Sequence, residues 1–275
     1  MEKIKEREEL MKKKLFVCSD VHGYYNEMKK ALNEAGFDEN NDAHLLIVVG
    51  DIFDRGSQAL AVYEYLKELI DKGKAIITRG NHDKFFIDFL QGSVNPFNYL
   101  HNGTNETIAD FWHRTAPFES WCALEGDCDL NQINYIKWVD ICSKEIKEEY
   151  PELLNWLKSL PRYYETKNYI FVHGAIDTKV EDWHNPHCFR YDLIDWDALD
   201  FNDGSFFGES IVNTDKTVVI GHYGTRFLRE MYDYPVEKGH EDDILIRDDG
   251  KVIAIDATTA ASNKVNVLVL EDELL

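Results

Sequence analysis

The chain has no apolar run that approaches the ~20 residues needed by a membrane-spanning helix, although 44% of its 275 residues are hydrophobic. It has no basic excess either, since 30 lysines and arginines face 51 aspartates and glutamates, for a formal net charge of -21. Affinity for the nucleic-acid backbone comes from cationic side chains, so we expect neither a membrane nor a nucleic-acid duplex as partner. A small phosphorylated ligand held by metal ions remains compatible with the acidity, because bound cations are often the largest charges in a site.

The five cysteines are odd in number and form no Cys-x-x-Cys pair. This pattern argues against a disulfide framework and against a zinc site built on thiolates. It is typical of reduced thiols, and the N-terminus carries charges where a secretory signal peptide would have an apolar core. We therefore expect a cytoplasmic protein. The absence of a dimerisation repeat favours a monomer.

The length suits one large domain, and no low-complexity linker or internal repeat divides residues 1–275. Residues 1–14 are almost wholly charged and are expected to form an N-terminal extension. Met11 is a candidate alternative start, which would make the first ten residues dispensable. Residues 91–160 are rich in tryptophan and helix-like segments, so we expect a helical insertion beside the sheet and over the site. Its tryptophans favour core packing, with Trp112 and Trp121 the first candidates for a substrate-stacking wall.

Strand-like and helix-like segments alternate in the first third of the chain. Apolar runs at 15–18, 45–49 and 75–78 are separated by segments with apolar residues at helical spacing, the first of which ends at Gly36. This alternation predicts parallel strands with helices on the sheet faces. In open sheets of that kind, ligands bind beyond the carboxyl ends of the strands.

Further strand-like runs follow the insertion, at 169–172 and 218–220. Three more, at 244–247, 252–255 and 265–270, have the spacing of a closing antiparallel meander. Asp249-Gly250 is expected to form the hairpin turn between the first two of these.

Five of the apolar runs end in side chains that can bind a metal, and we expect the five strands to deliver them to the same edge of one sheet. These are Asp20 and His22, Asp51, Asn81 with His82, His173, and His222. Carboxylate, carboxamide and imidazole ligands suit Mn²⁺, Fe or Zn²⁺. Asp51 stands between the two groups of ligands in chain order, so it is the natural bridge. Two cations ~3.5–4 Å apart can clamp both oxygens of an in-line displacement at phosphorus.

The motifs around these residues resemble those of the calcineurin-like metallophosphoesterases. They are Asp20-x-His22-Gly23, Gly50-Asp51-x-x-Asp54-Arg55-Gly56, Gly80-Asn81-His82-Asp83, His173-Gly174 and Gly221-His222. The Asp-Arg-Gly ending resembles the phosphoprotein phosphatase branch, which includes bacterial and phage protein phosphatases and diadenosine tetraphosphate hydrolases. The resemblance implies an α/β (α+β) fold with a central β-sandwich of mixed sheets flanked by helices. Ser19 and Asp83 replace a more frequent Gly and Glu, at positions not expected to bind metal.

The resemblance also implies a role for each residue. One metal would be held by Asp20, His22 and Asp51, and the other by Asp51, Asn81, His173 and His222, with Mn²⁺ favoured and Fe or Zn²⁺ as alternatives. A metal-bridging hydroxide would attack phosphorus directly. His82 would protonate the leaving oxygen, Asp54 would orient His82, and Arg55 would bind phosphoryl oxygens. A second phosphate-binding arginine is expected, with Arg190 slightly preferred to Arg226.

Simpler interpretations of these residues stay open. His82 is also suited to capping the following helix, and Asp54 and Arg55 to a surface ion pair. The remaining histidines fit no ligand pattern, although His184-x-x-His187 is a weaker candidate for substrate contact.

Three functions are compatible with the motifs. The favoured one is a phosphatase of phosphorylated Ser, Thr or Tyr side chains, because symmetrical dinucleotide hydrolases often have Asn where Asp54 stands. The alternative is a hydrolase of dinucleoside polyphosphates or another small nucleotide. A metal-bearing binding module without catalysis is disfavoured by the complete set of ligands and acid residues. The expected partner is thus a phosphorylated protein or small molecule as substrate.

Overall fold

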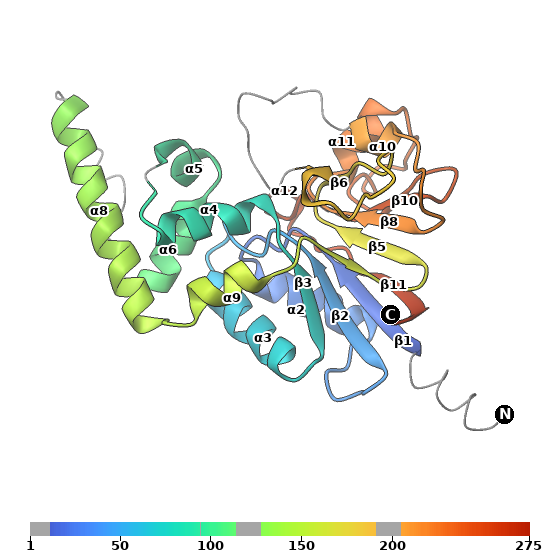
Figure 1. Ribbon diagram of the computed structural model, residues 1–275, viewed down its shortest axis with the longest axis horizontal. Helices are drawn as coiled ribbons and strands as arrows, with labels where there is room; N and C mark the ends of the chain where they lie inside the picture. Colours follow the sequence, from blue (N-terminus) through green and yellow to red (C-terminus); the bar gives the residue numbers. More distant parts are fainter. Residues whose placement is uncertain (1–11, 94, 114–127, 191–204) are drawn as a thin grey trace.

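The computed structural model describes residues 12–93, 95–113, 128–190 and 205–275 (Figure 1). Two mixed β-sheets form its centre. The first has the order β11-β1-β2-β3, and its strands are β1 (Lys12–Cys18), β2 (His44–Val49), β3 (Ala75–Thr78) and β11 (Leu268–Glu273). The second has the order β4-β5-β8-β10-β9, with β4 (Tyr163–Glu165), β5 (Tyr169–Val172), β8 (Thr217–Ile220), β9 (Leu245–Ile246) and β10 (Val252–Ala254). The short strands β6 (Ala175–Ile176) and β7 (Phe189–Arg190) pair beside it.

Side-chain alternation along the strands produces three buried layers. Leu15, Val17 and Ile47 of the first sheet pack against Phe171 and Val219 of the second, so the sheets face each other as a sandwich. The intervening residues of each strand point outward and are buried under helices. Both faces of each sheet are therefore covered, which explains why the strands are continuous apolar runs.

Helices cover the outer faces of both sheets. The core cluster on the first sheet begins with α2 (Tyr25–Ala35) and α3 (Ala59–Asp71). It continues into helices that pack against one another: α4 (Asn81–Leu90), α5 (Pro96–His101), α6 (Thr104–Trp112), α8 (Cys128–Glu149) and α9 (Leu153–Ser159). Beyond these, the structure describes α10 (Ser205–Gly208), α11 (Thr225–Met231), α12 (Thr259–Ser262) and a 3-10 turn at Pro186–Cys188. In Figure 1, α8 lies at the end of the molecule away from the second sheet. None of the helices that the structure describes is long and apolar enough to cross a membrane.

The mixed α/β sandwich is the fold class that the sequence predicted. Strands β1, β2 and β3 are parallel, and α2 ends at Gly36 with a left-handed φ of 84°. The single sheet edge inferred from the residues alone is wrong, because the five strands that carry the candidate ligands are divided between two sheets. Their carboxyl ends still converge, since His173 Nδ1 donates a hydrogen bond across the sandwich to the Val49 carbonyl oxygen at 3.0 Å.

The predicted closing meander is wrong in its third strand. Strands β9 and β10 form an antiparallel hairpin through Asp249-Gly250. Strand β11 instead crosses to the first sheet and pairs antiparallel with β1. Strand β10 already has neighbours on both sides, whereas β1 has an open edge whose Lys12 forms an ion pair with Glu271 of β11 at 3.0 Å. The ion pair between β1 and β11 is thus consistent with a pairing that the apolar periodicity of the sequence does not predict.

The same pairing shortens the expected extension. Residues 12–14 belong to β1, so the expected boundary at residue 14 is wrong. Residues 1–11, including Met11 and the ten residues predicted to be dispensable, lie outside the described part of the chain.

Candidate metal centre

The loops that follow the strands hold the candidate side chains in an unusual backbone conformation. Six non-glycine residues of the site have a positive φ, between 49° and 74°: Asp20, His22, Asp51, Asp54, Arg55 and His222. Such residues are uncommon and cost on the order of 1–3 kcal/mol each, so they persist only where the surroundings impose them. Here the loops brace one another, because His22 N donates to Asp51 O at 3.0 Å and Gly56 N donates to His22 O at 2.8 Å.

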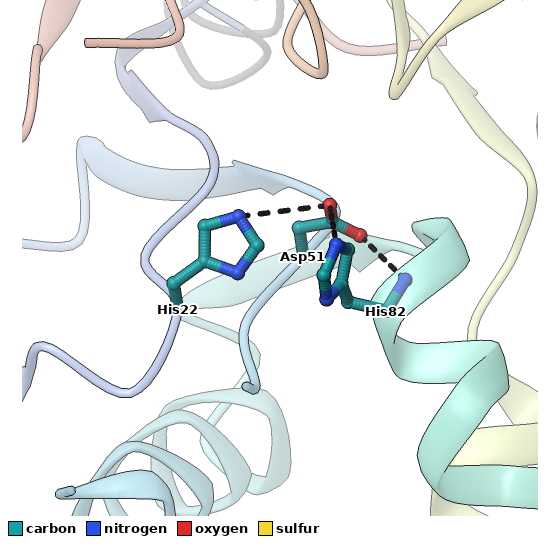
Figure 2. A group of neighbouring side chains, drawn as sticks. All are labelled: His22, Asp51 and His82. Atoms are coloured by element: carbon teal, nitrogen blue, oxygen red, sulfur yellow. Dashed lines mark hydrogen bonds and ion pairs between the residues drawn. The ribbon is translucent and has the colours of Figure 1, made fainter. Parts of the chain in front are cut away.

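Asp51 lies at the centre of the site, and Figure 2 shows it between two of its neighbours, His22 and His82. Its Oδ2 is 3.8 Å from His22 Nε2, 4.0 Å from His82 Nε2 and 3.2 Å from His173 Nε2. Its Oδ1 accepts a hydrogen bond from the His82 backbone N–H at 2.9 Å. A single buried carboxylate therefore faces imidazoles from both sides.

A second group meets beside it. Asn81 Oδ1 lies 3.1 Å from His173 Nε2 and 2.9 Å from His222 Nδ1, and the two ring nitrogens are 3.2 Å apart. These atoms all come from loops at the carboxyl ends of β3, β5 and β8. The structure thus gathers the predicted ligands of the second metal within hydrogen-bonding distance of one another.

In two of the histidines that face Asp51, the ring nitrogen Nδ1 is hydrogen-bonded to a backbone carbonyl. His22 Nδ1 donates to Phe53 O at 2.8 Å, and His173 Nδ1 donates to Val49 O at 3.0 Å. In the neutral rings, Nε2 therefore carries a lone pair that points toward carboxylate or carboxamide oxygens. Carbonyl-oriented imidazoles of this kind are typical of metal ligands, and facing electron pairs favour a cation between them.

Two sets of side chains place one ligand atom each within 4.8 Å of the others: His22, Asp51 and His82, and Asp51, His173 and His222. Both sets share Asp51, as the sequence predicted for a bridging ligand. Asp20 lies close to the first set, with its Oδ1 3.9 Å from His22 Nε2. The donors present therefore fit two cations that share one carboxylate.

Burial and neighbouring charges tune these groups in opposite directions. Burial lowers the pKa of His22 well below its usual range, and burial together with His173 lowers the pKa of His222 to about 3. Burial also acts to lower the pKa of His173, but the adjacent Asp51 carboxylate outweighs it and raises that pKa to about 10. Burial opposes ionisation of Asp51, yet His173 and the other rings hold its pKa well below the usual range. The Asp51 carboxylate thus favours the protonated His173 ring, and the His173 ring favours the ionised carboxylate.

Asp20 is held by the two segments that follow β8 and β10 of the second sheet. Its carboxylate accepts the His222 backbone N–H at 3.0 Å, and its carbonyl accepts Thr259 Oγ1 at 2.8 Å. Burial and the nearby Asp256 carboxylate raise the pKa of Asp20. Asp256 is itself 5% exposed and was missed by the sequence analysis. Its position directly after the predicted strand at 252–255 is the signal that would have revealed it.

Asp83, which replaces a more frequent Glu in the family motif, supports the backbone of the site. It is fully buried, and its Oδ2 accepts the backbone N–H groups of Gly80 at 2.8 Å and Asp51 at 3.1 Å. Its Oδ1 accepts Ile52 N at 3.0 Å. Asp83 therefore fixes the backbone of the central carboxylate without facing a metal.

Replacing Asp83 with alanine should lower the free energy of unfolding by roughly 2–4 kcal/mol, because each buried donor left unpaired costs about 1–3 kcal/mol. Denaturant titration of the metal-free protein measures this loss. Asp83→Glu is the matched control, since it keeps the carboxylate and should lose clearly less. Equal stability of Asp83→Ala and the unchanged protein would contradict the bracing role.

His82 is held by a carboxylate on its far side. Its Nδ1 lies 2.8 Å from Asp54 Oδ2, and its Nε2 lies 3.3 Å from a terminal nitrogen of Arg55. Asp54 is fully buried, whereas Arg55 is exposed. Asp54 and Arg55 do not form the local surface pair considered as an alternative. Instead, Asp54 is committed to His82, and the Arg55 guanidinium lies beside the His82 nitrogen that faces Asp51.

Arg226 and Arg190 are the two candidates for a second phosphate-binding arginine. The structure describes the side chain of Arg226 but only the backbone of Arg190. Arg226 donates twice to the Asp242 carboxylate, at 2.7 and 3.1 Å, on the surface. The backbone of Arg190 pairs with Ala175, two residues beyond His173, but the Arg190 side chain lies outside the described atoms. The backbone position is therefore close to the centre, and the phosphate-binding role of Arg190 stays a prediction.

The weaker candidates lie elsewhere. His184 stacks on Trp183, with ring centroids 3.7 Å apart, and pairs with Glu165 at 3.3 Å. Trp112 is 8% exposed and donates its indole N–H to Glu145, which suits core packing rather than a stacking wall. Trp121 lies outside the described residues.

Comparison with known proteins places this geometry in a family. The family profile of calcineurin-like phosphoesterases matches residues 13–258. The chain belongs to the calcineurin-like phosphoesterase family. Its members depend on a dinuclear metal centre, which agrees with the ligand sets around Asp51.

Relatives in this family carry nucleotide-hydrolase names. A symmetrical bis(5'-nucleosyl)-tetraphosphatase of Proteus mirabilis is 38% identical over 242 residues, covering 76% of this chain and 83% of that protein. An asymmetrical bis(5'-nucleosyl)-tetraphosphatase of Bacillus subtilis is 29% identical over 100 residues, which span 34% of this chain and only 40% of the relative.

Solved structures confirm the fold. A crystal structure provisionally described as a diadenosine tetraphosphatase matches with a TM-score of 0.52 and 14% identity, covering 96% of this chain and 94% of that one. A protein serine/threonine phosphatase from Saccharomyces cerevisiae matches with a TM-score of 0.50 and 14% identity, covering 96% and 80%. At such identities the likeness concerns the fold alone.

Proposed function

We propose that this phosphoesterase hydrolyses dinucleoside polyphosphates, such as diadenosine tetraphosphate, at a centre of two divalent cations. The observation that carries the proposal is the 38% identity to a symmetrical bis(5'-nucleosyl)-tetraphosphatase over 76% of the chain. It favours the alternative of the sequence analysis over a phosphoprotein substrate, which was preferred there.

The chain's own residues divide the work. Asp20, His22 and Asp51 would hold one cation, and Asp51, Asn81, His173 and His222 the other. When bound, the cations would supply Lewis acidity to the phosphoryl oxygens and to water. The donor set suits Mn²⁺, Fe or Zn²⁺, with Mn²⁺ our choice.

Arg55 and His82 would act on the ester itself. Arg55 is exposed beside His82, where its planar guanidinium can bind two phosphoryl oxygens at once. His82 would donate a proton from Nε2 to the leaving oxygen, while Asp54 holds the opposite nitrogen at 2.8 Å. Arg190, whose backbone lies opposite Ala175, is our candidate for the second phosphate contact.

One observation favours a second function, hydrolysis of phosphorylated Ser, Thr or Tyr side chains. Buried Asp54 contacts His82 Nδ1 and leaves Nε2 facing the site, which is the arrangement of a general acid. An alkoxide leaving group needs that proton far more than a nucleotide phosphate does, because the nucleotide is much the stronger acid. Phosphomonoester hydrolysis is therefore kept as the second candidate.

A substrate panel separates the two functions. With Mn²⁺, we expect kcat/KM for diadenosine tetraphosphate to exceed that for a phosphoserine peptide by about tenfold or more, and a chelator to abolish both reactions. Chromatography of the products should show only ADP, the result of symmetrical cleavage. Asp51→Asn protein purified in the same way controls for contaminating phosphatases. A preference for the peptide would transfer the proposal to the second function, and turnover without metal would contradict the metal centre.

A further inference from the structure

Two threonines in the first turn of α6 donate hydrogen bonds to the carboxylate of Asp54. Thr104 Oγ1 donates to Asp54 Oδ2 at 2.8 Å, and Thr107 Oγ1 donates to Oδ1 at 3.1 Å. Both threonines and Asp54 are fully buried. Residues about fifty positions apart in the chain therefore meet at the carboxylate that holds Nδ1 of the proposed acid, His82.

The hydrogen-bond directions are determined by the partners. The Asp54 backbone N–H donates to Thr107 Oγ1 at 2.8 Å, so the single hydroxyl hydrogen of Thr107 is left for Asp54 Oδ1. Asp54 Oδ2 receives Thr104 and lies 2.8 Å from His82 Nδ1. Each carboxylate oxygen thus has at least one donor. Burial raises the pKa of Asp54, while the bonds from His82 and the two threonines act to lower it.

The same turn also reaches the next residue of the loop. Gly103, which precedes α6, accepts the Arg55 backbone N–H at its carbonyl oxygen, at 3.1 Å. A side chain at Gly103 would come within 2.7 Å of that nitrogen, so close approach is part of the arrangement. Helix α6 therefore contacts both residues that surround His82.

Core packing alone does not require these hydroxyls. Helix α6 is anchored by Ile108, Phe111 and Trp112, which join the large core cluster on the first sheet. Helices α4 and α6 pack against each other, and α4 begins with Asn81 and His82 (Figure 1). The two threonines, three residues apart on one face, add polar contacts to Asp54 on top of that packing.

We propose that Thr104 and Thr107 are positioning residues that hold Asp54 so that His82 is aimed at the leaving oxygen. This inference rests on the proposed hydrolysis of phosphate esters, and it applies to both candidate substrates. Neither threonine contacts substrate in this role. They act through Asp54, in the way that outer partners orient an imidazole at other sites.

The test uses a series of aryl phosphates whose leaving groups differ in acidity. Thr104→Val and Thr107→Val keep the side-chain shape and remove the hydroxyl. We expect kcat for phenyl phosphate to fall by about tenfold and kcat for 2,4-dinitrophenyl phosphate to change by less than about twofold, because a good leaving group needs little protonation. Thr104→Ser restores the donor and should restore the rate. Thr217→Val, at the far end of β8 from His222, controls for loss of a threonine hydroxyl.

A second readout is independent of turnover. In zinc-loaded protein labelled with ¹⁵N-histidine, the His82 Nδ1 proton should give a downfield resonance that weakens or shifts in the two valine variants and persists in Thr104→Ser. Metal content and melting temperature of each variant are measured alongside, so that unfolded protein is recognised.

The outcomes are distinct. A uniform loss of rate across the aryl series, or no loss in folded valine variants, would overturn the positioning role. Absence of turnover in the unchanged protein, with the aryl esters and the dinucleotide alike, would instead refute the proposed function. The resonance then decides the positioning role alone, since an unaltered His82 signal in both valine variants would overturn it.

Discussion

Asp51→Asn protein is expected to lose its metal and its activity together. The neutral side chain keeps an oxygen for the His82 backbone N–H, but it removes the charge that both ligand sets share. Metal affinity should fall by more than about 100-fold, since removal of even an outer partner of a metal ligand costs about 10–100-fold. Metal analysis after dialysis and kcat with the preferred substrate measure the two losses on one sample.

The control for this change is a buried carboxylate elsewhere. Asp272 is 3% exposed and accepts Thr166 Oγ1 at 2.6 Å and Asn168 N at 2.8 Å, on β11. Asp272→Asn should lower stability and leave metal content and kcat unchanged. Retention of two metals per chain by Asp51→Asn would show that Asp51 does not bridge them.

The predicted ligands met in the structure because their positions follow from local rules. Each of them lies within four residues of the end of a short apolar run, and the parallel strands of one sheet end at the same edge. The rule holds within each sheet, and the packing of the two sheets brings the two sets of carboxyl ends together, as the bond from His173 to Val49 shows. The predicted ligands therefore lie close together although their strands are divided between two sheets, and their binding of metal stays a prediction.

The residues that the sequence analysis missed are defined by distant contacts. Asp83 meets backbone groups of Asp51 and Ile52, 32 and 31 positions away, and Thr107 meets Asp54 across 53 positions. Nothing in the local sequence of a buried aspartate or helical threonine distinguishes such a role. The segment predicted as an insertion over the site thus contributes, through α6, to the orientation of its acid.

The crossing of β11 was hidden for a similar reason. The apolar residues of 265–270 satisfy either sheet, so periodicity does not choose between them. The choice depends on which strand has an unpaired edge, and that is known only when both sheets are assembled. The sheet to which β11 belongs therefore depends on the whole fold and not on its local sequence.

His82→Ala should lower kcat by about 10²–10⁴-fold on a phosphoserine peptide while the metal content stays at that of the unchanged protein. The metal measurement is needed because His82 Nε2 lies 4.0 Å from Asp51 Oδ2, close enough for His82 to belong to a ligand set. A proton donor and a ligand therefore predict different results. Loss of a metal with the side chain would make His82 a ligand and remove it from the acid role.

The size of the loss also depends on the substrate. On diadenosine tetraphosphate the leaving nucleotide is a much stronger acid, so the same variant should lose clearly less than on the peptide. Asp54→Asn is the matched change, because it keeps the side-chain shape and one oxygen acceptor, while an amide NH2 replaces the other oxygen and the charge beside His82 is lost. It should show the same dependence on leaving group with a smaller loss. Equal losses of His82→Ala on both substrates would mean that His82 binds phosphate rather than protonating the leaving oxygen.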